Sequence, residues 1–219
     1  NILNAFDRVI YSDNLEIADF SSWIFKHDVV EACTAVKGAA FLKLFKLGYN
    51  KVVYLDPDTA IFSSLRPLFE LLSTYSIILT PHQLEPNDKF IDIQKYELES
   101  LKFGIFNLGF AAASNTPHGI KFAEWWSKVL YSACYSEIEN GLFTDQKWCD
   151  LVPVFFDNVH ILKDPGYNVA TWNLSRRRVT IDNDGNILVN CRPFVFFHFT
   201  KMGREGDILI QNFIDNNIE

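Results

Sequence analysis

The chain has 219 residues, of which 48% are hydrophobic and 21% are charged, and it carries a formal net charge of −7. This length and balance are typical of one globular domain with a sizeable core. The negative charge argues against a general nucleic-acid or anionic-membrane binder, because the summed field repels phosphate. No stretch approaches about 20 consecutive apolar residues, so no membrane-spanning helix is predicted.

The four cysteines lie far apart in the chain, at Cys33, Cys134, Cys149 and Cys191. Their spacing contains no C-x-x-C pair, which argues against a zinc site, and a chain of this size does not need disulfide bonds to fold. No signal-peptide pattern opens the sequence. We therefore expect reduced thiols and a cytoplasmic location.

The first predicted elements are a helix at residues 31–47 and a strand at 52–55. Apolar residues recur at helical spacing in the first segment, at Ala35, Ala39, Leu42 and Phe45, and Gly48 marks its end. The apolar run of the second segment stops at two acids, Asp56 and Asp58, which flank a proline. The function therefore depends on what these two acids do.

The same criteria predict further elements in chain order: a helix beginning at Arg66, strands at 76–79 and 105–113, a helix from Asn115 to about Tyr131, a hairpin of 179–181 with 187–189, and a strand at 194–199. Helices that alternate with apolar strands predict one α/β domain over residues 1–219, with a mixed, mainly parallel sheet and helices on both faces. Ligands of such sheets bind outside the carboxyl ends of the strands, where the two acids lie.

Asp56 and Asp58 have two interpretations. Asp and Pro both favour turns, so D-P-D is also suited to a strand-ending turn. Side chains two residues apart in an extended segment point the same way, and Pro57 biases Asp56 towards an extended conformation. Two carboxylates held close together repel each other, and a divalent cation relieves that repulsion. We favour the metal site.

Two enzyme classes place a D-x-D sequence after an apolar strand. Haloacid-dehalogenase-like phosphatases use D-x-D-x-T, but here Thr59 follows the second acid directly, which is the wrong register. Thr80 could supply their second motif, whereas Asp207 lacks a second, well-spaced acid. The other class comprises nucleotide-sugar glycosyltransferases, whose D-x-D holds a divalent cation on a diphosphate. A non-catalytic domain that binds sugar or nucleotide is a third interpretation.

The order of short motifs resembles glycosyltransferase family 8, a retaining group. The motifs are, in chain order, Ala35-Val36-Lys37, Tyr54-Leu55-Asp56-Pro57-Asp58, Phe106-Asn107-Leu108-Gly109, Thr144-Asp145-Gln146, Gly166-Tyr167-Asn168 and His198-Phe199. The resemblance runs from about residue 30 to residue 204, which is most of the chain. Each motif alone is weak, but their shared order is a specific signal.

The resemblance implies a metal ion, Mn²⁺ or Mg²⁺, that Asp56, Asp58 and His198 bind on the diphosphate of the donor. Two carboxylates and an imidazole are a donor set that suits Mn²⁺. The alternative for His198 is a packed core histidine, since it stands among phenylalanines.

Four further positions match family residues near the donor sugar. Asn107 and Gly109 match the segment that faces the sugar, although the same residues also suit a plain core strand. Asp145 and Gln146 match an acid that holds sugar hydroxyls and an amide near the anomeric carbon, and they are the predicted catalytic residues. A helix N-cap is an equal alternative for Asp145.

Three basic residues complete the predicted binding site. Lys37 matches a basic position near the donor phosphates or sugar, with a solvated helix face as the alternative. After the histidine, Lys201 replaces the family's glycine, and Arg204 stands where a phosphate-binding lysine is expected. Which of these two side chains meets the phosphate stays open.

The resemblance implies a GT-A (Rossmann-like) fold and the transfer of a sugar from a nucleoside diphosphate, with UDP favoured, to a saccharide or other acceptor, with retention of configuration. Family members open with a strand, a helix and a second strand that bind base and ribose. Here the D-x-D arrives after only 55 residues, and only Arg8–Tyr11 suits a short strand, so we expect this chain to lack those elements. An unpaired sheet edge would then favour association with another copy, or with further parts of a larger chain.

Overall fold

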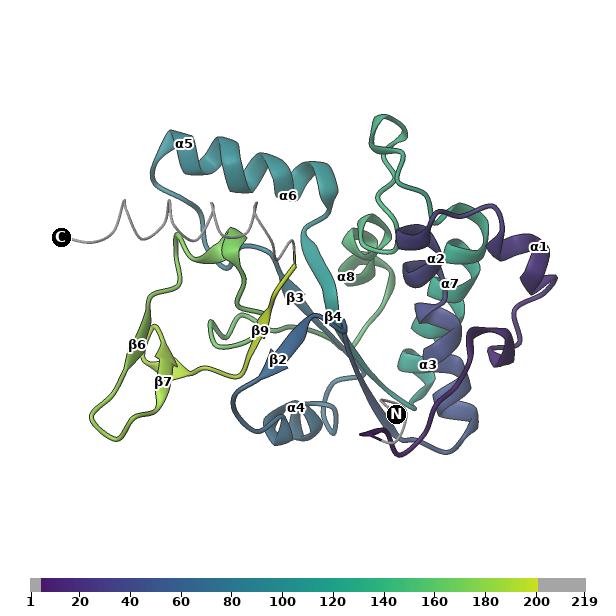
Figure 1. Ribbon diagram of the computed structural model, residues 1–219, viewed down its shortest axis with the longest axis horizontal. Coiled ribbons are helices and arrows are strands. Elements are labelled where there is room, and N and C mark those ends of the chain that lie inside the picture. The colour runs from purple at the N-terminus through teal and green to yellow at the C-terminus, as the bar shows by residue number, and fades with distance from the viewer. Residues whose placement is uncertain (1–4, 201–219) are drawn as a thin grey trace.

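The computed structural model of the protein describes residues 5–200, and its centre is a four-stranded sheet (Figure 1). In spatial order the strands are β1 (Lys51–Leu55), β4 (Phe106–Ser114), β3 (Ile77–Pro81) and β5 (Val159–Ile161). The first three match apolar runs in the sequence, and β4 is buried along its whole length. β1 forms one edge of the sheet and has no partner on its outer side within residues 5–200.

β4 runs antiparallel to both β1 and β3, and only the β3–β5 pair of this sheet is parallel within the described residues. The predicted α/β class is confirmed, but the prediction of a mainly parallel sheet is wrong. A parallel neighbour needs a crossover connection over the sheet. The segment 82–105 instead leaves and re-enters the sheet at one end, where His82 N donates to Ile105 O (2.9 Å). β4 therefore returns antiparallel to β3.

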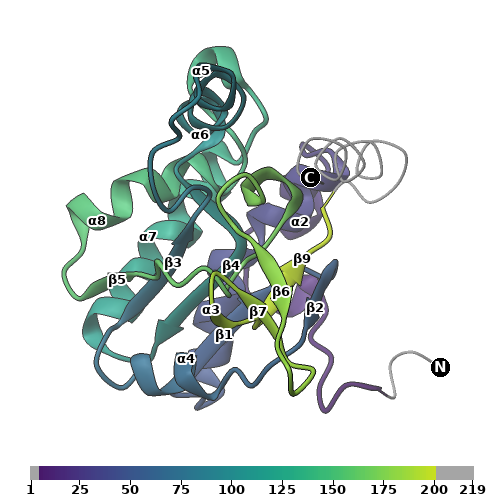
Figure 2. The same ribbon diagram turned by 90° about the vertical axis from the view of Figure 1, so that its left-hand side faces the viewer.

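The segment 82–105 forms a helical projection beyond that end of the sheet. It contains α5 (Phe90–Asp92), the π-helical turn η3 (Ile93–Glu97) and α6 (Leu98–Phe103). Figure 2 shows α5 and α6 above the sheet, at the top of the molecule. The projection does not cover either face of the sheet.

α3 (Lys37–Lys46) and α7 (Pro117–Ala133) pack together on one face of the sheet (Figure 1). α7 begins as predicted, with Thr116 accepting a hydrogen bond from Gly119 N (3.3 Å) and proline in its first turn. The two helices touch closely, because a Cβ on Gly38 of α3 would lie only 2.4 Å from the backbone nitrogen of Ser127.

α4 (Arg66–Leu71) covers the opposite face, together with residues 162–167 and residues 195–196. Alternate strand residues divide between the two faces. Ile77 and Leu79 of β3 belong to the core under α3 and α7, whereas Ile78 packs under α4. The predicted helices on both faces of the sheet are confirmed.

The predicted helix at 31–47 consists of two helices, α2 (Val29–Ala35) and α3, that meet at Val36. Just before the junction, the hydroxyl of Thr34 donates to a backbone carbonyl one turn earlier (3.0 Å), a bond that bends helices. The break makes Lys37 the first residue of α3 and buries it. The sequence pattern alone gave no indication of this break.

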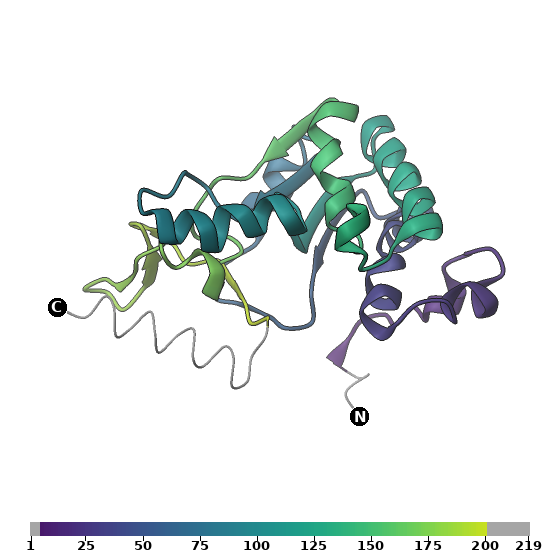
Figure 3. The same cartoon turned by 90° about the horizontal axis from the view of Figure 1, so that it is seen from above.

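Two smaller sheets contain the other strands. β2 (Thr59–Ile61) pairs antiparallel with β9 (Phe196–His198), so the predicted strand at 194–199 is shorter than expected. β6 (Val179–Ile181), β7 (Ile187–Val189) and β8 (Arg192–Pro193) form the third sheet, and β6–β7 is the predicted hairpin. Figure 3 shows this hairpin, in yellow-green, and the purple N-terminal helical turns at opposite ends of the molecule.

The remaining elements are short: η2 (Ser12–Asn14), α1 (Phe20–Ile24), η4 (Ile138–Asn140), η5 (Lys147–Leu151), α8 (Val152–Phe155) and η6 (Thr171–Asn173). Arg8–Tyr11, which suited a short strand, belongs to none of the strands of the described residues. All four cysteines, each within the described range, are free thiols. No helix in residues 5–200 has both the length and the apolar character needed to cross a bilayer.

Candidate metal centre and active site

The structure brings the three predicted metal ligands together where β1 ends. β2 follows β1 after the D-P-D turn and pairs with β9 so that Thr59 lies opposite His198. The turn is bonded on both sides, because Asp56 N donates to Gly109 O (2.9 Å) and Phe199 N donates to Asp58 O (2.8 Å). Two strands that are distant in sequence thereby place the acids beside the histidine.

Asp56, Asp58 and His198 each offer one ligand atom, and these three atoms all lie within 4.8 Å of one another. His198 Nε2 is 3.2 Å from Asp58 Oδ1 and 3.6 Å from Asp56 Oδ2. The side chain of His198 is only 5% exposed, whereas that of Asp58 is 43% exposed. The cluster is therefore held by the protein on the histidine side and open to solvent on the aspartate side.

Lys37 lies beneath this cluster rather than on a solvated helix face. Its Nζ donates to Leu108 O (2.8 Å), is 2.9 Å from Asp145 Oδ2 and is 3.5 Å from Asp56 Oδ1. It also lies 4.5 Å from the ring centre of Tyr54. Burial by itself lowers the pKa of Lys37, but its interactions with Asp145, then Tyr54, then Asp56 together outweigh burial and raise it. The ammonium is therefore charged and already paired.

Asp145 is buried against Lys37 and caps no helix. The turn that follows begins at Lys147, and its N-terminus has no side-chain cap. Desolvation raises the pKa of Asp145, although the Lys37 ammonium opposes that shift. The N-cap alternative is thus wrong, because the carboxylate bonds Lys37 instead of the backbone at the start of η5.

Gln146 lies beside β4 with both ends of its amide engaged. Its Nε2 donates to Phe103 O (3.0 Å) and its Oε1 accepts from Leu108 N (3.3 Å). The same backbone segment, at Leu108, also binds Lys37 through its carbonyl. Leu108 of β4 therefore links Gln146, which bonds its nitrogen, to Lys37, which bonds its carbonyl. Lys37 in turn pairs with Asp145 and approaches Asp56.

Asn107 and Gly109 lie behind the histidine. Asn107 Oδ1 is 3.1 Å from His198 Nδ1, and a Cβ on Gly109 would lie 2.3 Å from Cε1 of the same ring. Only glycine leaves room for the imidazole here. The structure thus gives both residues contacts with His198, which the sequence analysis did not foresee.

The sequence analysis assigned no role to four neighbours of the site, of which Tyr54 and Asn168 appeared only within motifs. The hydroxyl of Tyr54 donates to Asp56 Oδ1, His82 contacts Asn107, and Trp172 packs edge-on against His198, with ring centres 5.3 Å apart. Asn168, noted only as part of a motif, donates to Asn107 Oδ1 (3.0 Å). His82 carried a usable signal, because it follows β3 at the same end of the sheet where the D-x-D follows β1.

The charges of the cluster favour one divalent cation. Asp56, Asp58 and Asp145 face one ammonium, that of Lys37, and burial lowers the pKa of His198 even though Asp58 and Asp56 oppose the shift. With a neutral imidazole, the carboxylates exceed the ammonium by two negative charges. Two carboxylates and an imidazole are also a donor set suited to Mn²⁺. These residues fit a divalent ion.

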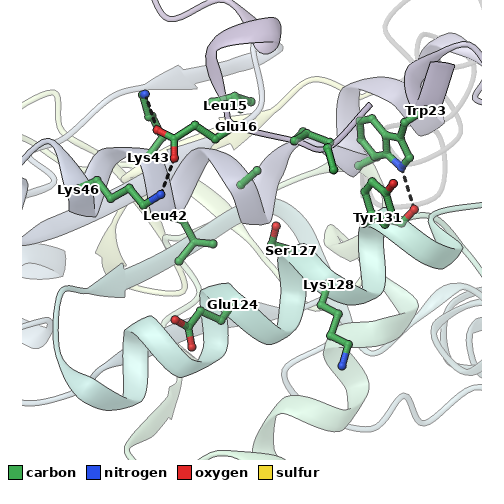
Figure 4. A pocket seen from close by; sticks show the side chains of 14 residues that line it. Leu15, Glu16, Trp23, Leu42, Lys43, Lys46, Glu124, Ser127, Lys128 and Tyr131 are labelled. Atoms are coloured by element: carbon green, nitrogen blue, oxygen red, sulfur yellow. Dashed lines mark hydrogen bonds and ion pairs between the residues drawn. The ribbon is translucent and has the colours of Figure 1, made fainter. Parts of the chain in front are cut away.

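Two cavities in the described part of the chain lie away from this cluster. One, of about 370 Å³, lies between residues 15–23, α3 and α7, and Figure 4 shows Lys43 and Lys46 reaching Glu16 at its rim. The other, of about 750 Å³, lies between α4 and residues 160–167. None of the three candidate ligands lines either cavity. The candidate site is therefore identified from the arrangement of its side chains and not from a cavity. Lys201 and Arg204, the predicted phosphate contacts, lie outside the described residues.

Comparison with known proteins finds two relatives in Bacillus subtilis (strain 168). The chain is 30% identical to the uncharacterized protein YfnD over 149 residues, which are 67% of this chain and 45% of the relative. It is 25% identical to the uncharacterized protein YfnF over 153 residues, 69% of this chain and 49% of the relative. The chain thus spans about half the length of these relatives. No model of a protein family and no solved structure matches it.

Proposed function

We propose that this chain is a metal-dependent glycosyltransferase domain that moves a sugar from a nucleoside diphosphate, UDP in the first instance, to a saccharide or other acceptor. One observation carries the proposal. Asp56, Asp58 and His198 converge at the end of a strand, with two negative charges in excess and a neutral imidazole. A nucleotide-sugar enzyme needs such a cation site next to its donor.

The proposed cation is Mn²⁺ or Mg²⁺, held by Asp56, Asp58 and His198. When bound, it offsets the negative charge that develops on the leaving diphosphate. Because Asp58 is the most exposed of the three side chains, the donor approaches from its side of the cluster. The buried Lys37 ammonium lies 3.5 Å from Asp56 Oδ1, on the side of the cluster away from solvent.

Asp145 and Gln146 are the proposed contacts of the donor sugar. Both are fixed within the protein, Asp145 by Lys37 and Gln146 by two backbone groups. Fixed polar atoms orient a substrate without loss of side-chain entropy on binding. Within residues 5–200, no strongly nucleophilic side chain with an activating base lies beside Gln146, which favours attack by the acceptor on the face that the diphosphate leaves. Retention of the anomeric configuration follows from such a front-face reaction.

The fold is part of the same proposal. A mixed sheet with helices on both faces, and a metal cluster at the carboxyl end of β1, is compatible with a GT-A fold. Because the chain spans about half the length of its relatives, the acceptor and the complete reaction of the whole protein also belong to the proposal.

The test is a panel of nucleotide sugars, UDP- and GDP-linked, with and without Mn²⁺. We expect Mn²⁺-dependent thermal stabilisation by UDP compounds and slow release of free sugar, and both should be absent in Asp58→Asn. NMR of the product should show a retained anomer. Release of inorganic phosphate from phosphate monoesters would support the phosphatase interpretation instead, and binding without turnover in the full-length protein would support a binding domain.

A further inference from the structure

Three hydrogen bonds converge on one oxygen behind the candidate metal centre. Asn107 Oδ1 lies 3.1 Å from the backbone nitrogen of Gly109, 3.0 Å from Asn168 Nδ2 and 3.1 Å from His198 Nδ1. Asn107 and His198 are both buried, with 8% and 4% of their surface exposed. Because these buried groups bond to one oxygen, the positions of their hydrogens depend on one another.

The backbone nitrogen of Gly109 determines the arrangement. A backbone N–H can only donate, so the Asn107 atom that faces it must be the amide oxygen. That oxygen can only accept, so His198 Nδ1 must carry a hydrogen. The neutral ring then has its free electron pair on Nε2, which is the nitrogen that faces Asp56 and Asp58. A metal-binding imidazole requires this tautomer.

The other end of the amide is fixed in turn. With its oxygen towards His198, Asn107 presents Nδ2 to His82 Nε2 at 3.3 Å. His82 must accept there, which leaves its hydrogen on Nδ1, 3.3 Å from Ile105 O. Burial lowers the pKa of His82 to about 4, so its ring stays neutral and able to accept. The chain of hydrogen bonds through Asn107 and His82 therefore begins at a backbone donor, Gly109 N, and ends at a backbone acceptor, Ile105 O.

Packing holds the histidine ring in the same place. Gly109 leaves the gap that the ring occupies, since any Cβ there would lie 2.3 Å from Cε1 and 2.5 Å from Nδ1 of His198. Trp172 closes the other side, nearly perpendicular to the ring at 88°, and also packs against His82. The ring cannot turn over to exchange its two nitrogens without displacing these neighbours.

We propose that Asn107 is a positioning residue, with His82 behind it, that locks His198 in the Nδ1–H tautomer and presents Nε2 to a divalent cation. The part of this inference that concerns the cation rests on the proposed function. The tautomer of His198 follows from the hydrogen bonds of the protein alone. The sugar-facing role predicted for Asn107 is then secondary, because its oxygen already accepts three hydrogen bonds.

The test compares Asn107→Leu, Asn107→Asp and His82→Phe, with Asn115→Leu as the matched control at the far end of β4, where Asn115 Nδ2 bonds Phe45 O. Long-range nitrogen–proton NMR of metal-free protein reports the tautomer of His198. We expect the Nδ1–H form in the parent, in Asn107→Asp, which keeps the acceptor, and in Asn115→Leu. In Asn107→Leu we expect a mixture of tautomers.

Mn²⁺ titration followed by electron paramagnetic resonance provides the second readout. Loss of such a supporting partner lowers metal affinity by about 10- to 100-fold, which we expect for Asn107→Leu. His82→Phe should lose less, Asn107→Asp should recover most of the affinity, and Asn115→Leu should equal the parent.

Two results would overturn the inference: an Nε2–H tautomer in the metal-free parent, or an Asn107→Leu protein with the tautomer and Mn²⁺ affinity of the parent. If Asn107→Leu does not fold, Asn107→Ala, which removes the same acceptor from His198 Nδ1, is compared with the parent by the same two readouts. A parent protein that binds no Mn²⁺ would instead overturn the proposed function, and the tautomer would still decide the role of Asn107.

Discussion

Lys37 shows how much one buried charge determines at this site. It pairs with Asp145 at 2.9 Å and approaches Asp56 at 3.5 Å, and its side chain is 3% exposed. A buried ion pair contributes little net stability relative to apolar residues, but removing one partner leaves the other charge uncompensated. The proposed metal ligand Asp56 and the proposed sugar contact Asp145 therefore depend on the same ammonium.

We expect Lys37→Met to lower the free energy of unfolding by about 3 kcal/mol, because Asp145 keeps a buried charge without a partner. Adding Asp145→Asn should recover part of that loss, since no unpaired charge then remains. Urea denaturation followed by circular dichroism measures both. Lys46→Met, on an exposed side chain of the same helix, is the control. Equal free energies of unfolding for Lys37→Met and the control would show that the Lys37–Asp145 pair does not contribute this stability.

Asp58 is the ligand whose loss should cost least in stability, since its side chain is 43% exposed at a strand end. We expect Asp58→Ala to leave the melting temperature of the metal-free protein nearly unchanged and to remove most of the stabilisation by Mn²⁺ with UDP. Thermal shift with and without the ion measures this, with the exposed Asp157→Ala as control. The metal assignment fails if UDP and Mn²⁺ stabilise both variants equally.

The affinity for Mn²⁺ should depend on pH through His198. Burial is the main cause that lowers its pKa, and the nearby Asp58 and Asp56 only partly oppose the shift. A proton competes with the metal for Nε2, so affinity falls once pH drops below the folded pKa. Because that pKa is lowered, affinity should hold at pH of about 6.5, where an ordinary histidine is half protonated, and fall below it. A midpoint above that pH would contradict the burial argument.

At the scale of elements, β4 supplies the most contacts to the site. Its residues Asn107, Leu108 and Gly109 contact His198, Lys37 and Gln146, while its far half packs in the core. A central strand buried on both faces is rigid, and this rigidity fixes the positions of the side chains it carries. The F-N-L-G motif is therefore part of a core strand and contacts His198 of the candidate metal centre, while its place beside a donor sugar stays a prediction.

Gly109→Ala tests this role of β4. The added Cβ would lie 2.3 Å from the ring of His198, so the ring must move while the strand stays paired. We expect weaker Mn²⁺ binding with an unchanged far-UV spectrum. In the background of His198→Phe the same substitution should cost no further Mn²⁺ affinity, because the ligand is already gone. Additive losses in the double variant would show that Gly109 acts by another route.

At the scale of the whole molecule, the site joins segments from residue 37 to residue 198. β9 is held beside the D-x-D turn by its pairing with β2, three residues on each side, and by the hydrogen bond from Phe199 N to Asp58 O. An ion bound to all three ligands would tie this short pairing to the main sheet. Binding to the folded state alone raises its stability by mass action.

We expect Mn²⁺ at about 100 times its Kd to raise the free energy of unfolding by about 2.7 kcal/mol. For a domain of this size that corresponds to a rise in melting temperature of about 5–10 °C. Differential scanning calorimetry in Mn²⁺ and in EDTA measures the shift. No shift at saturating Mn²⁺ would show that the three side chains do not bind the ion together.

The sequence by itself determined the local features. The apolar run ending at Asp56 and Asp58, the capped start of α7 and the β6–β7 hairpin depend on residues within a few positions of each other, and all three are confirmed. Pro57, just after the strand, likewise restricts the backbone between Asp56 and Asp58. Association with another copy through an unpaired sheet edge stays a prediction.

The tertiary structure alone decided what depends on distant residues. The direction of β4 depends on where the segment 82–105 re-enters the sheet, and no local pattern contains that information. Lys37 was predicted to lie near the donor phosphates or sugar, with a solvated helix face as the alternative. The structure excludes the solvated face, because Lys37 is buried and pairs with Asp145, far along the chain. His82, which follows β3, lies at the site because β3 pairs with β4, the strand that carries Asn107. The D-x-D spacing and the family resemblance indicated the candidate metal ligands, and the packing of distant segments brings their side chains together.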